Sequence, residues 1–304
     1  MPPFTLRQLE YFRAVAETGT FSGAATRMFV SQSAIASAIG DLESALGVQL
    51  CTRKRSSGIG LTPSGVQFLE KARALLRQAD DVTHAAHHGD GLLAGAINIG
   101  CYATLAATVL PALLDEFSAQ HPQSQLNFVD GTMEELMPLL EQGRLDFVIT
   151  YRISLQLGLQ QMALYDTAVH ALLPANHPLA HAPTVSLHDL ADDPLILLNI
   201  PPSGRHTLDM LASANIRPLV RHTTTNFELA RSLVGRGLGY CLLVQKPEID
   251  LTYEGLPVVA KPISPEFSRE QVVLVWPDGM ELSARARICA EFARATLGRA
   301  QPPR

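Results

Sequence analysis

A chain of 304 residues is too long for one small domain, so its length predicts two or three domains. Its 47% hydrophobic and 17% charged residues are typical of a well-packed globular protein. No apolar run is long enough to span a bilayer, and the N-terminus lacks the basic start and apolar stretch of a secretory signal. We therefore expect a cytoplasmic protein that does not contact a membrane.

The net charge of −5 is unevenly distributed along the chain. Residues 1–62 carry a net charge of +2, residues 63–95 carry −1, and residues 96–304 carry −6. A weakly basic head on an acidic body suits a protein whose head alone faces phosphate groups. Because +2 is modest, we expect tight binding to need two heads.

Three short helices are predicted in the first 47 residues. Apolar residues at helical spacing predict a helix over residues 5–18, which Gly19 ends; they are Leu6, Leu9, Phe12, Val15 and Ala16. Ser22 is the predicted N-cap of a second helix, whose inner residues are Ala24, Ala25 and Met28. Ser31 is predicted to cap a third helix from Gln32 to Leu46, which Gly47 ends; its inward residues would be Ala34, Ile35, Ile39, Leu42 and Leu46.

The next predicted unit is a strand, a turn and a second strand. Residues 48–51 and 59–62 read as two strands joined by a turn at residues 56–58. The second and third predicted helices meet at a tight junction, residues 29–32, and a basic turn follows them. This order predicts a helix-turn-helix with a wing, which is a DNA-binding arrangement.

Thr62 to Gly65 open a helix whose unbroken part covers residues 66–88, and glycines at 89, 91 and 95 mark a hinge. The apolar stripe of this helix is too long to be hidden within a small head, so we expect it to pair with the same helix of a second copy. Its members are Phe68, Leu69, Ala72, Leu75, Leu76, Ala79 and Val82.

From residue 96 the pattern alternates between strands and helices, which indicates parallel-sheet units. The predicted strands cover residues 96–101, 125–129, 146–149, 168–173, 195–198, 239–244 and 271–276. The predicted helices cover residues 105–117, 134–142, 227–235 and 283–297. Two such α/β lobes with crossing connections would enclose a cleft, where a ligand would meet strand ends and helix N-termini.

Taken in chain order, these motifs resemble LysR-type transcriptional regulators over essentially the whole chain. The head has that family's spacing, and its basic wing is followed by the sequence LTPSG at residues 61–65. Four short motifs of the body also fall in family order; they lie at residues 110–111, 143–146, 177–180 and 233–239. Each body motif alone is weak evidence for the family, but the four motifs together with the head are specific for it.

The resemblance implies a fold in two parts. A mainly α winged helix-turn-helix domain with a long linker helix precedes an α/β two-lobed effector domain, similar to the type 2 periplasmic binding proteins. We assign residues 1–62 to the DNA-binding domain, 63–92 to the linker helix and hinge, and 93–304 to the effector domain. Lobe I would comprise about 93–165 and 268–304, and lobe II about 166–267.

The resemblance also implies how such a protein works. Members are transcriptional regulators rather than enzymes, and they typically form homotetramers that bind two adjacent operator sites in duplex DNA. A small effector shifts their arrangement on DNA, and RNA polymerase is a further partner if the protein activates transcription. No cofactor is implied.

The predicted recognition helix departs from the family pattern. Ser33 and Ser37 replace the usual proline and arginine, and Ala36 and Ala38 replace two polar residues. The helix thus offers side chains that can contact bases but no positive charge, so phosphate contact is expected to shift to the wing. The alternative interpretation of the basic residues 53–55 is that they form a solvated loop with no role in binding phosphate. The predicted DNA-binding residues are Ser22, Ser31, Gln32, Ser33, Ser37, Arg53, Lys54 and Arg55.

The residues of the effector cleft are assigned by matching positions in this sequence to the family's motifs. Hydroxyls and backbone N–H groups at helix starts suit a small carboxylate or a similar anion. Tyr151 stands where some members that sense aromatic acids carry arginine, which makes a charge clamp on a simple aromatic acid less favoured. Ordinary helix capping is the alternative role for any one of these residues. The predicted effector residues are Cys101, Tyr102, Ala103, Thr104, Gly131, Thr132, Thr150, Tyr151, Asn199, Pro202, Ser203, Thr225, Asn226 and Phe227.

Other functions explain fewer features of the sequence. The four cysteines, at positions 51, 101, 241 and 289, form no CxxC pair, so reduced buried thiols are expected, with a redox-responsive regulator as the alternative. His84 and His88 have metal-pair spacing but no third ligand, so no metal is expected. A solute-binding protein would leave the head unexplained, and a DNA-binding scaffold would leave the cleft unexplained. No nucleophile, base or metal constellation indicates an enzyme.

Overall fold

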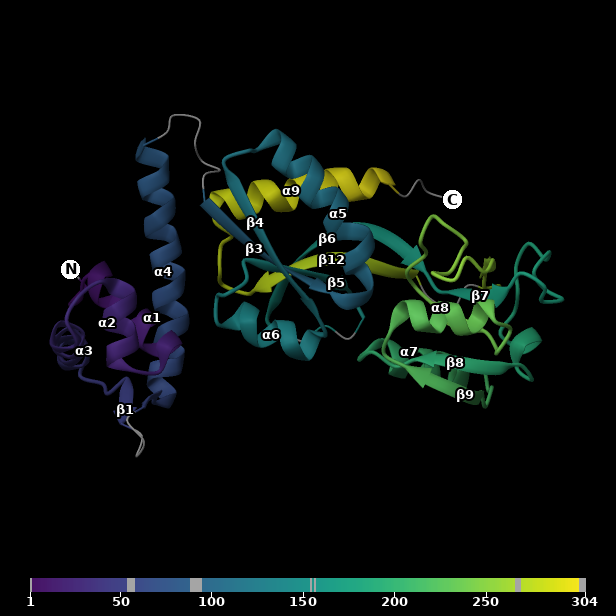
Figure 1. Cartoon of the computed structure of the whole chain (residues 1–304), viewed down its shortest axis with the longest axis horizontal. Coiled ribbons are helices and arrows are strands. Elements are labelled where there is room, and N and C mark those ends of the chain that lie inside the picture. The colour runs from purple at the N-terminus through teal and green to yellow at the C-terminus, as the bar shows by residue number, and fades with distance from the viewer. Residues whose placement is uncertain are drawn as a thin grey trace.

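The structure is a computed structural model that describes residues 2–53, 58–87, 95–153, 155, 157–265 and 269–300. Figure 1 shows three parts in a row: a small helical head, a lobe built on a five-stranded sheet, and a second lobe. The long helix α4 (Pro63–His87) stands between the head and the rest, which we call the body.

The head contains α1 (Leu6–Thr18), α2 (Phe21–Met28) and α3 (Gln32–Leu46), followed by an antiparallel pair, β1 (Cys51–Arg53) and β2 (Ile59–Leu61). Gly19 and Gly47 end α1 and α3 in the left-handed conformation that glycine adopts without strain, as predicted. A single core joins these elements to α4; it includes Leu9, Phe12, Ile35, Ile39, Leu42 and Leu50.

Three predictions for the head are wrong in detail. Thr20, not Ser22, caps α2, because the Thr20 Oγ1 accepts a hydrogen bond from the Gly23 backbone N at 3.0 Å, while Ser22 lies inside the first turn. Ala34 and Leu6 are exposed rather than buried. The first strand begins at Cys51 rather than at residue 48, because Glu43 of α3 accepts hydrogen bonds from the backbone N–H groups of residues 50 and 51.

The apolar stripe of α4 is divided between two environments. Leu69, Ala72 and Leu76 are buried in the head core, so the head hides more of the stripe than the sequence suggested. Leu75 and Val82 are exposed, Val82 at 70%. The expected pairing with a second copy therefore concerns only the exposed part of the stripe, and it stays a prediction.

The first lobe has a mixed sheet in the order β4-β3-β5-β12-β6. Its strands are β3 (Gly95–Tyr102), β4 (Ser124–Gly131), β5 (Phe147–Tyr151), β6 (Leu159–Ala168) and β12 (Arg269–Pro277). The first three are mutually parallel, as predicted, whereas β12 pairs antiparallel with both β5 and β6. Helices α5 (Ala103–Gln120) and α9 (Ala284–Ala300) cover one face, and α6 (Met133–Glu141) covers the other (Figure 1).

The second lobe holds two small sheets. Strand β7 (His170–Pro174) pairs antiparallel with β10 (Cys241–Leu243) and β11 (Val258–Pro262), and β8 (Pro194–Leu198) runs parallel to β9 (Leu219–Thr224). Helices α7 (Ser203–Ser213), α8 (Phe227–Gly235) and the short η1 (His188–Leu190) complete the lobe. Strands β6, β9 and β11 and helices α7 and η1 were not predicted.

One hydrophobic core runs through both lobes. It joins residues of the large sheet, such as Ile149 and Leu274, to Leu172, Leu198 and Leu243 of the second lobe. The lobes therefore share buried apolar surface, and their facing edges lie close enough for direct side-chain contact.

Candidate functional site

Helix α3 presents a polar face to solvent. Ile35 and Ile39 are buried on one side, while Gln32, Ser33 and Ser37 are exposed on the other. The Ser31 Oγ accepts a hydrogen bond from the Ala34 backbone N at 3.1 Å, which fixes the start of the helix. Among the described residues, the side chains of Gln32 and Ser37 make no hydrogen bond, so both are available to an external partner.

The structure describes only some of the other residues that were predicted to contact DNA. Arg53 ends β1, but its side chain, Lys54 and Arg55 lie outside the described part of the chain. Ser22 is exposed in the first turn of α2. Phe29 was not predicted as a site residue, yet it is 94% exposed at the junction between α2 and α3, with a φ of 54°. Its position in the tight junction between two predicted helices was the only feature of the sequence that singled out Phe29.

A second group of predicted residues meets where the two lobes face each other. Tyr102 and Tyr151 end strands β3 and β5, and their rings lie edge to face with centroids 5.7 Å apart. The Thr104 hydroxyl, in the first turn of α5, donates to the Tyr151 hydroxyl at 3.4 Å. Burial raises the pKa of both tyrosines, so both phenols stay protonated at neutral pH.

Tyr102 also connects the lobes. Its hydroxyl lies 3.1 Å from the Ser203 hydroxyl of α7 and within 3.3 Å of the carbonyl oxygens of Ile200 and Pro201. A second contact joins the lobes, because the Gln245 Nε2 donates to the Thr108 Oγ1 of α5 at 2.8 Å. The cleft between the lobes is therefore closed by direct polar contacts in this structure.

A cavity of about 20 Å³ remains in the closed cleft, which is room for roughly one water molecule. Four of the predicted effector residues line it: Thr104, Tyr151, Ser203 and Phe227. The other lining residues are Ile153, Val169, Leu198, His206, Thr207, Leu242, Leu243, Val244 and Gln245. No lysine or arginine is among the described residues that line the cavity, so its charge gives no support to the small carboxylate that the sequence suggested.

Several other predicted effector residues have local structural contacts instead. Thr132 starts α6 in a capping box, in which the Glu135 carboxylate accepts from both its backbone N and its hydroxyl. A side chain at Gly131 would collide with that carboxylate. Cys101 and Thr150 are buried within the sheet. Ala103, Asn199, Pro202 and Thr225 lie at the ends of elements near the cleft without lining the cavity.

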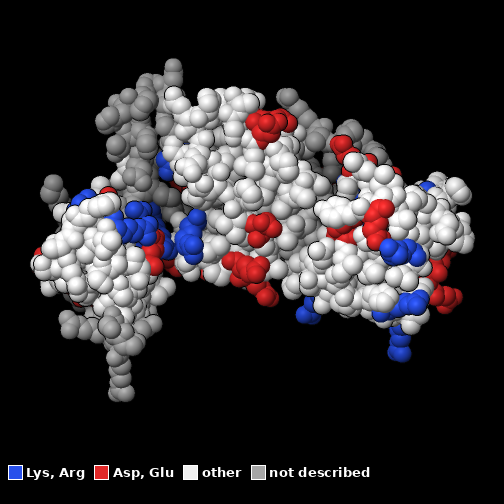
Figure 2. Space-filling view, viewed as in Figure 1, with Lys and Arg blue, Asp and Glu red and all other residues white. Residues whose placement is uncertain are grey.

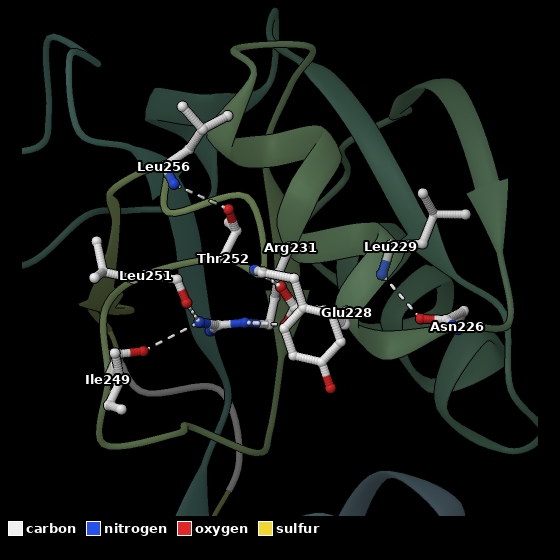
Figure 3. A network of polar contacts seen from close by, with 9 residues as sticks. Asn226, Glu228, Leu229, Arg231, Ile249, Leu251, Thr252 and Leu256 are labelled. Atoms are coloured by element: carbon white, nitrogen blue, oxygen red, sulfur yellow. Dashed lines mark hydrogen bonds and ion pairs between the residues drawn. The ribbon is translucent and has the colours of Figure 1, made fainter.

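Asn226 acts as the N-cap of α8, because its Oδ1 accepts a hydrogen bond from the Leu229 backbone N at 2.9 Å (Figure 3). The same helix is anchored by Arg231, which is only 3% exposed. The Arg231 guanidinium donates to Glu228 and to the carbonyl oxygens of Ile249 and Leu251 (Figure 3). This network joins α8 to the segment at residues 249–251, and Phe227 in the first turn of the helix lines the cavity.

Sequence reasoning missed His206 and Gln245, which also line the cavity. His206 lies on α7, which was not predicted, and its Nε2 is 3.2 Å from the Glu270 Oε1 at the start of β12. The neighbouring Glu270 carboxylate raises the pKa of His206, which favours the protonated ring. Only the tertiary structure brings residues 206 and 270 together, so no local signal could have identified this pair.

A larger cavity of about 590 Å³ lies between the head and the body, away from the predicted effector residues. Its described lining includes Arg13 and Arg27 from the head, Arg73 from α4 and Arg144 from the body. Figure 2 shows basic side chains gathered at this junction. The nearly buried Arg73 donates to Glu17 of α1 at 3.1 Å and to the Gln142 carbonyl oxygen of the body at 2.8 Å.

All four cysteines are buried and unpaired. Burial raises the pKa of Cys51, Cys241 and Cys289 to about 12, and it also raises the pKa of Cys101. Because the thiolate is the reactive form, buried thiols with raised pKa values react slowly with oxidants.

We therefore expect no cysteine of the native protein to react with a thiol-specific disulfide reagent within minutes at pH 7.5. Four thiols should react after unfolding in guanidinium chloride, which is the internal control for the count. Rapid labelling of one native thiol would show that a cysteine is more accessible than the structure places it and would favour a redox role.

No group of three metal-ligating side chains exists among the described residues, and His88 together with the side chain of His84 lies outside them. None of the helices within the described ranges is both long and apolar enough to cross a membrane.

Comparison with known proteins relates the chain to one family along most of its length. The model for the LysR substrate binding domain matches residues 90–298, and the model for bacterial regulatory helix-turn-helix proteins of the lysR family matches residues 6–66. The chain is 29% identical, over 97% of its length and 99% of the relative, to the uncharacterized HTH-type transcriptional regulator YvbU of Bacillus subtilis. It is 33% identical to a probable hydrogen peroxide-inducible genes activator of Mycobacterium avium, over 79% of this chain and 78% of the relative.

The solved structures give the same relationship. The crystal structure of HinK, a LysR family transcriptional regulator from Pseudomonas aeruginosa, is similar with a TM-score of 0.66 and 33% identity. The match covers 98% of this chain and 100% of HinK.

Proposed function

The chain belongs to the LysR family of DNA-binding transcriptional regulators, which are not enzymes, and we propose how its own residues carry out that function. Residues 1–62 would bind operator DNA, residues 63–92 would link and dimerise the subunits, and residues 93–304 would bind an effector. The observation that carries this proposal is that a small cavity is lined from both lobes, at the same edge of the large sheet where β3 and β5 end.

For the DNA contact, we propose that Gln32, Ser33 and Ser37 face the bases from α3. Glutamine can form two hydrogen bonds with adenine, whereas serine discriminates poorly. Ser22 and Ser31 would lie near the phosphates, together with the wing residues Arg53, Lys54 and Arg55. The exposed polar face of α3 supports this proposal, since nothing in the described chain covers it.

For the effector, we propose that it binds between the lobes against Thr104, Tyr151, Ser203 and Phe227. Because the cavity holds about one water molecule in the closed cleft, binding would separate the lobes. The contact from Arg73 to Gln142 supports a route from the body to the head. The buried thiols give no support to the redox alternative.

The remaining features of the proposal concern assembly and place of action. The protein would act in the cytoplasm, where bacterial operators are accessible. It would form homodimers through α4 that pair into homotetramers, and it would contact RNA polymerase if it activates transcription.

The direct experiment is footprinting of the full-length protein on the DNA upstream of its own gene. We expect protection of two adjacent, partly palindromic sites, with binding that weakens steeply as salt rises. Gln32→Ala should cost about 1–3 kcal/mol of discrimination at its adenine contact while bulk affinity changes little. Arg53→Ala with Lys54→Ala should lower affinity for all sequences and reduce the salt dependence. Absence of protection at low salt would contradict the proposal.

A further inference from the structure

Gln245 carries a hydrogen-bonding group that its surroundings do not satisfy. The residue follows β10, is only 4% exposed, and lines the cavity between the lobes. Its Nε2 donates to Thr108, but no donor among the described residues reaches its Oε1. A buried carbonyl oxygen without a donor is unfavourable, and such atoms in native proteins are usually satisfied by ordered water, an ion or a bound ligand. The unpaired Oε1 of a residue that lines the cavity is therefore an acceptor that a ligand could satisfy once the lobes separate.

The charges around the cavity indicate that the molecule it binds is uncharged. The described lining contains no lysine or arginine that could neutralise an anion. His206 is the one titratable cationic side chain in that described lining, and Glu270 already lies 3.2 Å from it. An anion next to His206 would therefore be repelled by the buried Glu270 carboxylate. A cation would have no unpaired acidic group in the described lining to meet it.

The remaining surface of the cavity is largely apolar. Ile153, Leu198 and Phe227 line it, as do Leu242, Leu243 and Val244. A ligand held there buries carbon atoms against these side chains while its polar group meets the amide of Gln245. Hydroxyls from Thr104, Ser203 and Thr207 surround the same space and can serve either as donors or as acceptors.

We propose that the effector is a small uncharged molecule with an apolar body and an N–H or O–H group that donates to the Gln245 Oε1. This inference rests on the proposed function, because it describes the occupant of the effector cleft. Gln245 is thereby a specificity-determining residue, since a ligand with a donor group forms a hydrogen bond with its Oε1, whereas a ligand with only acceptors leaves that Oε1 unpaired.

The same residue ties ligand binding to the movement of the lobes. Gln245 belongs to the second lobe, whereas its partner Thr108 belongs to α5 of the first. A molecule larger than one water cannot enter without separating the two, and the contact from Tyr102 to Ser203 lies on the same interface. The effector-bound form is therefore more open than the structure described above.

The test uses three compounds of nearly equal shape with the full-length protein: benzamide, benzonitrile and benzoate. Benzamide is uncharged and donates, benzonitrile is uncharged and only accepts, and benzoate is an anion. Acetamide, acetonitrile and acetate form a smaller matched set. In isothermal titration, we expect saturable binding of at least one amide, with the matching nitrile and carboxylate weaker by tenfold or more.

Two variants separate ligand contact from lobe contact. Gln245→Met keeps a long unbranched side chain but removes the acceptor, and it should weaken the bound amide at least tenfold. Thr108→Val removes the lobe contact of Gln245 but keeps its acceptor, so it should leave amide affinity unchanged or raise it up to about threefold, because one contact that opposes opening is lost. Circular dichroism and thermal unfolding establish that both variants are folded.

Three outcomes would overturn the proposal: preferential binding of a carboxylate, no saturable binding of either amide, or equal loss of affinity in the two variants. Each would assign the cavity to solvent or to another ligand class. Footprinting of the operator is independent of these titrations, so the regulator function can stand while the ligand class fails.

Discussion

Replacing Leu75 and Val82 by glutamate should convert the protein into a monomer that binds its operator at least about 100-fold more weakly. Both side chains are exposed on α4, on the part of the apolar stripe that the head does not cover. Two charges on this surface would oppose pairing with the same helix of a second copy, because their burial would be costly. Since two linked heads gain about 10²–10⁴ in affinity over one, a monomer loses that factor.

The measurements are analytical ultracentrifugation for the oligomeric state and titration of operator DNA for affinity. Ile249→Glu is the matched control, because Ile249 is also an exposed apolar residue but lies in the second lobe. The control should remain oligomeric with unchanged affinity. A Leu75→Glu/Val82→Glu protein that is still dimeric would show that α4 is not the dimer contact.

Replacing Arg73 by alanine should detach the head from the body and destabilise the head by about 2–3 kcal/mol, less than the roughly 3–5 kcal/mol of a fully buried pair because Glu17 is 26% exposed. Arg73 is 7% exposed and holds three segments together: α4, Glu17 of α1, and the Gln142 carbonyl oxygen after α6. Without it, Arg27, at 2.7 Å, is the remaining ion-pair partner of Glu17 among the described residues, and the Gln142 carbonyl oxygen loses the Arg73 donor. The head should then lose its fixed orientation relative to the body.

Small-angle scattering would measure the separation, and urea unfolding would measure the stability. Arg27→Ala is the matched control, because Arg27 pairs with the same Glu17 but is 53% exposed and does not reach the body. Its cost should be below about 1 kcal/mol, as for other surface ion pairs. Equal scattering profiles for Arg73→Ala and the wild type would contradict a role for Arg73 in holding the head.

The head was the part best predicted from sequence, because its signals are local. The limits of α3 follow from a serine cap and a glycine stop that act within one turn of the helix. Ser22 was misassigned for a related reason: Thr20, Ser22 and their neighbours offer several hydroxyls, and only the backbone conformation selects Thr20 as the cap.

The second lobe was predicted less well, because its elements depend on distant partners. Strand β9 has a mostly exposed surface and is defined by its parallel pairing with β8. Strand β11 is defined by its pairing with β7, more than 80 residues earlier in the chain. Such strands lack the alternating pattern of a half-buried strand, so a single sequence does not indicate them.

By itself, the sequence determined the class of protein, the order of its parts and the polar face of the recognition helix. Those features depend on spacing within a helix or on motifs in chain order. Only the tertiary structure decided that the cleft is closed, that Gln245 and His206 line it, and that Arg73 joins the head to the body. Each of these depends on residues between about 60 and 140 positions apart, and their approach is set by the packing of whole lobes rather than by any local pattern.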